Sequence, residues 1–157
     1  MKIRLVIAAF VASLQLAAIG QNQAPYQVQC VTQDADGNIT FRIWNPKAGK
    51  RYKQEIALKE GIHAILFSGL SGAGTCQGQP ALLKTSSEQE NFRKIEEEFF
   101  SKDGRWRNFA RQGDVGSASL EDTATKDMMV YIVRIARNDL RKYLEEQQII
   151  KRLNNGF

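Results

Sequence analysis

Histidine and cysteine are scarce in this sequence. Its 157 residues include one histidine, His63, and two cysteines, Cys30 and Cys76. A zinc site needs three or four such ligands, so we expect neither a metal site nor another cofactor. The composition is otherwise that of an ordinary globular domain, with 43% hydrophobic and 25% charged residues, which excludes a disordered or fibrous chain.

A hydrophobic run long enough to cross a bilayer is also missing. The apolar segment 5–19 follows Lys2 and Arg4 and ends in small residues up to Gly20. At about fifteen residues it is shorter than the roughly twenty that a membrane-spanning helix needs, and its pattern is typical of a secretory signal peptide. We expect residues 1–20 to be that signal peptide and 21–157 to form a single domain, exported to the periplasm or outer cell envelope, or secreted. A retained anchor is the alternative.

Positive charge exceeds negative charge only modestly. Twenty-two Lys and Arg face 17 Asp and Glu, a formal charge of +5. Removal of Lys2 and Arg4 with the signal peptide leaves 20 against 17, or +3. So small an excess does not itself indicate a partner, and because the protein is expected to be exported we expect no nucleic-acid partner.

Export would allow the two cysteines to form a disulfide. An oxidising compartment permits a disulfide that the cytosol would reduce. A bridge between Cys30 and Cys76 would close a loop of about 47 residues and stabilise the fold by roughly 4 kcal/mol. Two separate small thiols are the alternative.

The glycine-rich segment 69–75 resembles a nucleotide-binding loop without its lysine. That lysine carries the positive charge for the phosphates, and Thr75 cannot replace it. The next residues, Gln77 to Pro80, disfavour a helix, so no helix N-terminus points at this segment. We expect Gly69 to end a helix and residues 70–80 to be a flexible loop that binds no phosphate.

Hydrophobic periodicity predicts an α+β protein. Alternating residues indicate an antiparallel hairpin of strands 26–32 and 39–44, and an apolar run predicts a central strand over 128–136. Helical patterns cover 52–68, 88–100 and 139–148; a short helix over 105–111 and a weak strand near 115–120 complete the assignment. We expect a two-layer domain with a mostly antiparallel sheet of about four strands and three helices packed on it.

Capping residues give the expected helix starts. Ser87 with Glu90 forms the pattern of a capping box for the second helix. Asn138 is expected to cap the last helix.

The helix predicted over 52–68 is apolar on nearly all sides, which is typical of a buried helix. A stripe of small residues, including Gly61, would allow another element to approach closely. His63 lies on a third stripe with aromatic neighbours. It is either a packed histidine satisfied by a neighbour or a polar site with a catalytic or ligand role.

Basic and aromatic residues alternate in Arg105, Trp106 and Arg107. They form either a face for a partner or arginines whose stems cover a core aromatic ring. The chain ends in Phe157, which fits a docked tail or a partner-binding end. We take Arg105, Trp106, Arg107 and Phe157 as the candidate partner-binding surface.

The signal sequence that leaves Gln21 at the mature end, the helix over 57–69 and the ending over 140–157 together resemble small exported proteins of Bacteroidota that carry no assigned activity. The resemblance covers most of the mature chain. It implies a cell-envelope setting and supplies no catalytic residues.

Two functions are carried forward. No nucleophile, base and orienting group can be assembled from one histidine and scattered carboxylates. We therefore expect an envelope protein without catalysis, which binds another envelope protein or an anionic surface component through exposed apolar and basic surfaces. The alternative is a small hydrolase of envelope polymers that uses Asp114 with Glu121, or His63 with a nearby serine.

Overall fold

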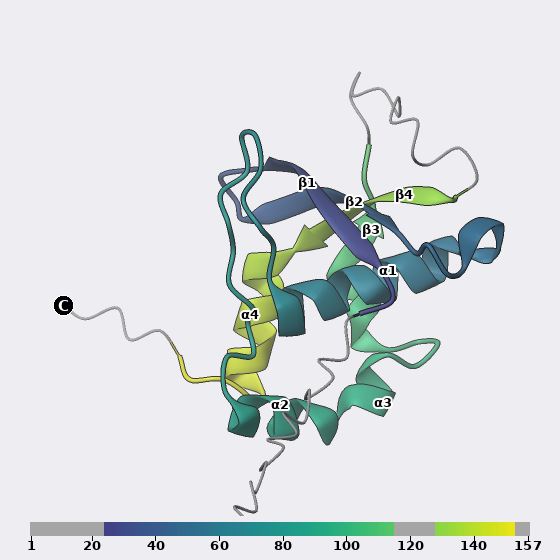
Figure 1. The fold of residues 1–157 in the computed structure, drawn as a ribbon. Coiled ribbons are helices and arrows are strands. Elements are labelled where there is room, and N and C mark those ends of the chain that lie inside the picture. The colour runs from purple at the N-terminus through teal and green to yellow at the C-terminus, as the bar shows by residue number, and fades with distance from the viewer. Residues whose placement is uncertain (1–23, 115–127, 153–157) are drawn as a thin grey trace, which may run out of the picture.

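The computed structural model describes residues 24–114 and 128–152 (Figure 1). Several predictions from the sequence lie outside these residues. They are the signal peptide 1–20, the weak strand near 115–120, Glu121 and Phe157.

The described strands form one antiparallel sheet, as the sequence predicted. It contains four strands in the order β1-β2-β4-β3. The strands are β1 Gln27–Gln33, β2 Asn38–Trp44, β3 Ala110–Gln112 and β4 Val130–Ala136. Strand β3 is a correction, because residues 110 and 111 were expected to be helical. Ala110 pairs instead with Ile135 of the central strand, a contact across the chain that a three-residue pattern does not encode.

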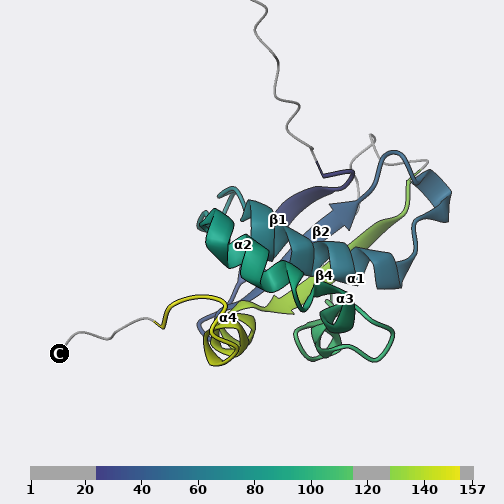
Figure 2. The same cartoon turned by 90° about the horizontal axis from the view of Figure 1, so that it is seen from below.

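The helices of the described chain lie on one side of the sheet, and α1 runs along it (Figure 2). Their bounds are η1 Gly49–Arg51, α1 Gln54–His63, η2 Ala64–Ser68, α2 Ser86–Arg93, α3 Glu96–Phe99, η3 Arg105–Asn108 and α4 Arg137–Glu146. The helix predicted over 88–100 is thus divided into α2 and α3. The α+β class with helices packed on an antiparallel sheet is confirmed.

The helix predicted over 52–68 closes with a π-helical turn, η2. Gly69 ends it, as predicted, with a φ of 71° that favours glycine. The π turn leaves backbone carbonyls of Ile65 and Leu66 for other partners. Leu82 and Leu83 donate their backbone N–H groups to them, at 3.0 and 2.9 Å, which ties the end of the helix to the segment before α2.

Both predicted helix caps are corrected. Thr85 caps α2: its hydroxyl accepts from the Glu88 backbone N–H, and the Glu88 carboxylate accepts from the Thr85 N–H. Ser87, the expected cap, lies inside the helix. Asn138 lies inside α4, where its side-chain amide donates to the backbone oxygen of Asp36. A sequence with several consecutive cap formers allows more than one start, and tertiary contacts select among them.

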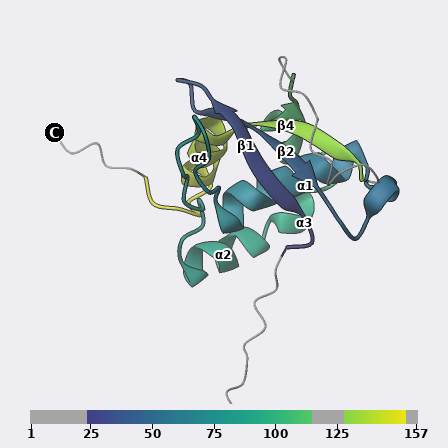
Figure 3. The ribbon, with the colours of Figure 1, turned by 45° about the horizontal axis from the view of Figure 1, so that its top comes forward.

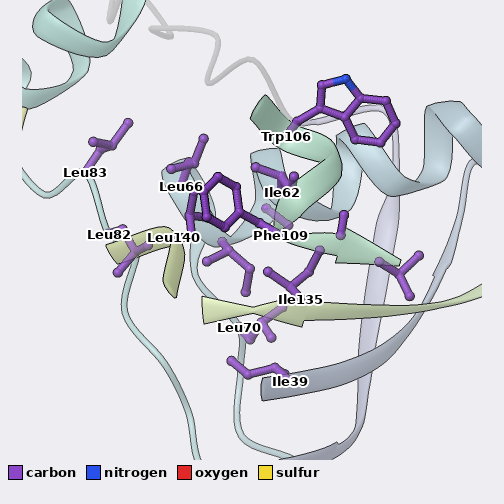
Figure 4. Packing of buried hydrophobic residues seen from close by; sticks show 14 of the residues in the cluster. Ile39, Ile62, Leu66, Leu70, Leu82, Leu83, Trp106, Phe109, Ile135 and Leu140 are labelled. Carbon is purple, nitrogen blue, oxygen red and sulfur yellow. The ribbon is translucent and has the colours of Figure 1, made fainter. Parts of the chain in front are cut away.

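The core lies between the sheet and the helices (Figure 4). Alternate residues of β2 and β4 face it, because successive side chains in a strand point to opposite faces. Ile39, Phe41, Ile43, Val133 and Ile135 are all buried there. Fully buried side chains from the helices include Ile62, Leu66, Phe92, Phe99, Leu140 and Leu144.

The predicted disulfide is confirmed. Cys30 of β1 and Cys76 are bonded, with α-carbons 6.2 Å apart. Next to the bond, the side-chain amide of Gln33 exchanges two hydrogen bonds with the backbone of Gln77. The loop 70–80 is thereby attached to the sheet edge. A disulfide indicates an oxidising, non-cytosolic compartment.

Candidate functional site

One face of the sheet points away from the helices, and we call it the open face (Figure 3). Strand alternation and register place three arginines on it. Phe41 and Ile43 of β2 face the core, so Arg42 between them points the other way. Arg134 of β4 lies on the same face, because Val133 and Ile135 on either side of it are buried on the core side. Arg111 of β3 pairs with Arg134 in the sheet and so shares this face. We call Arg42, Arg111 and Arg134 the open-face arginines.

Strand register brings two of these arginines together. Arg111 pairs directly with Arg134 across β3 and β4, and Thr40 pairs with Arg134 on the other side. Like charges directly opposite each other destabilise a sheet. The carboxylate of Asp34 lies 2.6 Å from the Arg134 guanidinium and so offsets part of this repulsion.

The groups around Asp34 keep it ionised. Hydrogen bonds from the side chain and backbone of Asn38 hold the pKa of the Asp34 carboxyl below its ordinary value, and the charge of Arg134 adds to the effect. Elsewhere on the open face, the guanidinium of Arg42 in β2 donates to the side-chain oxygen of Gln29 in β1 at 3.5 Å. The open face therefore combines three guanidinium groups with one carboxylate.

Charge is unevenly distributed over the described surface. Helices α2 and α3 carry five glutamates: Glu88, Glu90, Glu96, Glu97 and Glu98. The connection from β2 to α1 carries exposed basic side chains: Lys47, Lys50, Arg51 and Lys53. Negative charge thus gathers on α2 and α3, whereas the sheet and the β2–α1 connection are basic, and such an asymmetry steers anions toward the basic region.

Of the two interpretations of Arg105, Trp106 and Arg107, the structure agrees with the one in which basic side chains cover a core aromatic ring. The side chain of Trp106 is 1% exposed, and the indole N–H donates to the Ser101 backbone oxygen at 2.8 Å. The ammonium of Lys59 and the guanidinium of Arg107 lie 5.2 and 4.5 Å from the ring centre. The ring is a core residue covered by cations, because aromatic faces attract positive charge. Arg105 and Arg107 are exposed, and Arg107 lies over the buried ring.

His63 lies at a small pocket between the start of β1, the end of α1 and α3. The pocket has a volume of about 260 Å³. Its lining residues are Pro25, Tyr26, Lys59, Glu60, His63, Glu96 and Phe100. The phenol of Tyr26 and Nδ1 of His63 are hydrogen bonded at 2.7 Å. The sequence had identified His63 alone; its partners come from segments that are distant in the chain.

Burial shifts the ionisation of this group. It lowers the pKa of His63 and raises that of Tyr26 to about 12, so at neutral pH the imidazole is neutral and the phenol keeps its proton. Burial also raises the pKa of Glu60, against hydrogen bonds from Tyr52 and Asn45. Tyr52 donates to Glu60 Oε2 at 2.5 Å.

The hydrolase hypothesis named His63 with a nearby serine, and Asp114 with Glu121. Nδ1 of His63 is hydrogen bonded to a phenol rather than to a serine hydroxyl. Asp114 is exposed, and its proposed partner Glu121 lies outside the described residues.

Within residues 24–114 and 128–152, no three His, Cys, Asp or Glu side chains are placed to hold a metal ion. No helix in those ranges is long and apolar enough to cross a membrane.

The open-face arginines were missed by the sequence analysis. The available signal was an arginine inside an apolar run, since Arg134 is the single charge in the predicted strand 128–136. Comparisons with protein families, with curated proteins and with solved structures give no match to this chain. Its function is therefore argued from the geometry of the open face and the pocket.

Proposed function

We propose that this is an exported cell-envelope protein that binds an anionic envelope component through the open-face arginines, without catalysis. The observation that carries the proposal is the direct opposition of Arg111 and Arg134. A cross-strand pair of like charges is unfavourable in the free protein. A bound carboxylate or phosphate would relieve it, so the same repulsion that costs stability favours an anionic ligand.

Arginine suits such a ligand better than lysine does. Its planar guanidinium presents a fixed fork of donors that matches carboxylate and phosphate groups. Arg111 and Arg134 are both exposed, and Asp34 neutralises one of the two charges. The pair keeps a net positive charge to which the basic β2–α1 connection adds.

The small amount of exposed apolar surface on the described residues favours an anionic component over an apolar protein partner. The sequence predicted a helix over 52–68 that is apolar on nearly all sides. In the described residues, the exposed large hydrophobic side chains are Ile56 and Met129. Docking surfaces of stable complexes normally have a larger apolar centre. The disulfide supports the exported setting.

Binding to defined polymers tests the proposal. The oxidised protein is titrated with polygalacturonate, which carries carboxylates, with polyphosphate, and with uncharged dextran. We expect saturable binding to a polyanion and none to dextran, with affinity falling as salt rises, because exposed charges are screened. The double variant Arg111→Gln/Arg134→Gln should lose about tenfold or more in affinity, as expected for two charge-assisted contacts.

A matched control removes the same charge elsewhere. Arg93→Gln/Lys94→Gln lowers the net charge by the same amount at exposed positions of α2 and its end, and should retain most of the affinity. If both double variants lost affinity equally, net charge alone would explain the binding, and the open-face arginines would not be the binding site. Shortening of the polymer would instead support the hydrolase. Absence of polyanion binding, together with in-cell crosslinking to one envelope protein through another face, would support a protein partner.

A further inference from the structure

The pocket at His63 is separate from the open face and carries a different chemistry. None of its seven lining residues is an open-face arginine. Two of them are glutamates, Glu60 from α1 and Glu96 from α3, in a protein with a net positive charge. Glu60 is half-buried and accepts a short hydrogen bond from Tyr52, which holds one carboxylate in a fixed position.

Lys59 also lines the pocket, and its ammonium has two partners outside the lining. The ammonium of Lys59 lies 3.3 Å from the Glu55 carboxylate and 5.2 Å from the centre of the Trp106 ring. Both of these partners, Glu55 and Trp106, lie outside the pocket lining. The remaining polar side chains are the phenol of Tyr26 and the imidazole of His63, bonded to each other and both neutral.

The rest of the lining is apolar and aromatic. Tyr26 and Phe100 contribute aromatic rings and Pro25 an aliphatic ring. The negative faces of aromatic rings attract cations. We infer that this pocket binds the ammonium group of a small organic amine with an aliphatic body, through Glu60, Glu96 and the rings of Tyr26 and Phe100.

The volume limits the size of the amine. A cavity of about 260 Å³ lies below the usual range of roughly 300 to 1,000 Å³ for drug-sized ligands. An ammonium on a short alkyl stem, such as a lysine side chain, is of suitable size. The carboxylates would neutralise the charge, and the rings would cover the stem.

A pair of probes with the same carbon stem tests the contribution of the ammonium group. Nα-acetyl-lysine methylamide and Nα-acetyl-norleucine methylamide have the same four-carbon stem, but the lysine compound alone carries an ammonium. Both are titrated into the oxidised protein while amide NMR shifts are followed. We expect saturable shifts around the pocket for the lysine compound and about tenfold weaker binding of the norleucine compound, since hydrogen bonds to charged groups contribute about 1.5 kcal/mol or more.

Variants on one helix locate the site. Glu96→Gln should weaken binding of the lysine compound about tenfold, whereas Glu97→Gln, at the neighbouring exposed position outside the pocket lining, should not. Phe100→Leu should also weaken it while keeping an apolar side chain. The variant Arg111→Gln/Arg134→Gln should bind the lysine compound as the original protein does. Equal binding of both probes, equal effects of the two glutamate variants, or no saturable binding would each overturn the inference.

Discussion

Gly61 of α1 lies so close to Val133 of β4 that a β-carbon added to the glycine would stand 3.0 Å from Val133 Cγ1. The same atom would be 3.2 Å from the ring of Phe41. The small-residue stripe predicted from the sequence therefore allows the helix backbone to approach the sheet.

We expect Gly61→Val to lower the free energy of unfolding by about 1 to 3 kcal/mol, because the core cannot accommodate the added methyl groups without strain. Urea unfolding measures the change. Ile56→Val, at an exposed position of the same helix, should have little effect; similar losses in both variants would contradict the close packing.

Reduction of the disulfide should destabilise the protein. The bond joins residues separated by 46 positions, and the chain-entropy treatment gives a stabilisation of about 4 kcal/mol for a loop of this length. We expect the double variant Cys30→Ser/Cys76→Ser to unfold at lower urea and to match the reduced protein. Equal urea midpoints for oxidised and reduced protein would show that the bond contributes nothing.

The position of the α2 cap can be tested with two neighbouring hydroxyls. Thr85→Ala removes the acceptor for the Glu88 N–H and should lower the free energy of unfolding by about 1 kcal/mol. Ser87→Ala, inside the helix, should be neutral or slightly stabilising because alanine has the higher helix propensity. Chemical denaturation of the two variants decides between the caps. A larger loss for Ser87→Ala would restore the cap predicted from the sequence.

Trp106 should behave as a core residue rather than a binding residue. Trp106→Ala removes a buried indole with its hydrogen bond to Ser101 and should cost about 3 to 5 kcal/mol of stability. Arg105→Gln, beside it and exposed, should change stability by less than about 0.5 kcal/mol. Thermal unfolding provides the comparison. A stable Trp106→Ala variant with weakened polyanion binding would show instead that Trp106 takes part in binding.

His63 should make stability fall in mildly acidic solution. Burial lowers its pKa below the ordinary value of 6.5, so the unfolded chain takes up the proton first as pH decreases. The contribution of the neutral imidazole is present above about pH 6.5 and is lost as pH falls through the lower folded-state pKa. Glu60, whose pKa is raised, has the opposite slope, and Glu96 attracts the His63 proton.

A variant isolates the histidine contribution. The stability difference between the original protein and His63→Gln should shrink as pH is lowered from 7 toward 5, because the glutamine does not titrate. The contributions common to both proteins, including that of Glu60, cancel to first order in this difference. Urea unfolding at several pH values gives the curve. A difference that stays constant over this range would contradict a lowered pKa.

Local patterns predicted the elements that local patterns can specify. Ile39, Phe41 and Ile43 alternate with polar residues, and this spacing places them on one face of a strand whatever that face contacts. The helix that ends at Gly69 and the apolar strand over 128–136 were found for the same reason. The cap of α2 was misplaced because Thr85, Ser86 and Ser87 all have the required side-chain oxygen, and the choice among them depends on packing.

The sequence by itself determined the α+β class, the principal strands and helices, and the availability of two cysteines for a bond. The tertiary structure decided that the cysteines meet, that Trp106 is buried, and that Arg111 stands opposite Arg134. It also assembled the pocket around Tyr26 and His63, whose partners come from different elements. Periodicity records which way a side chain points within its own element. Which residues face each other across elements depends on strand register and on the packing of distant segments, and no local pattern contains that information.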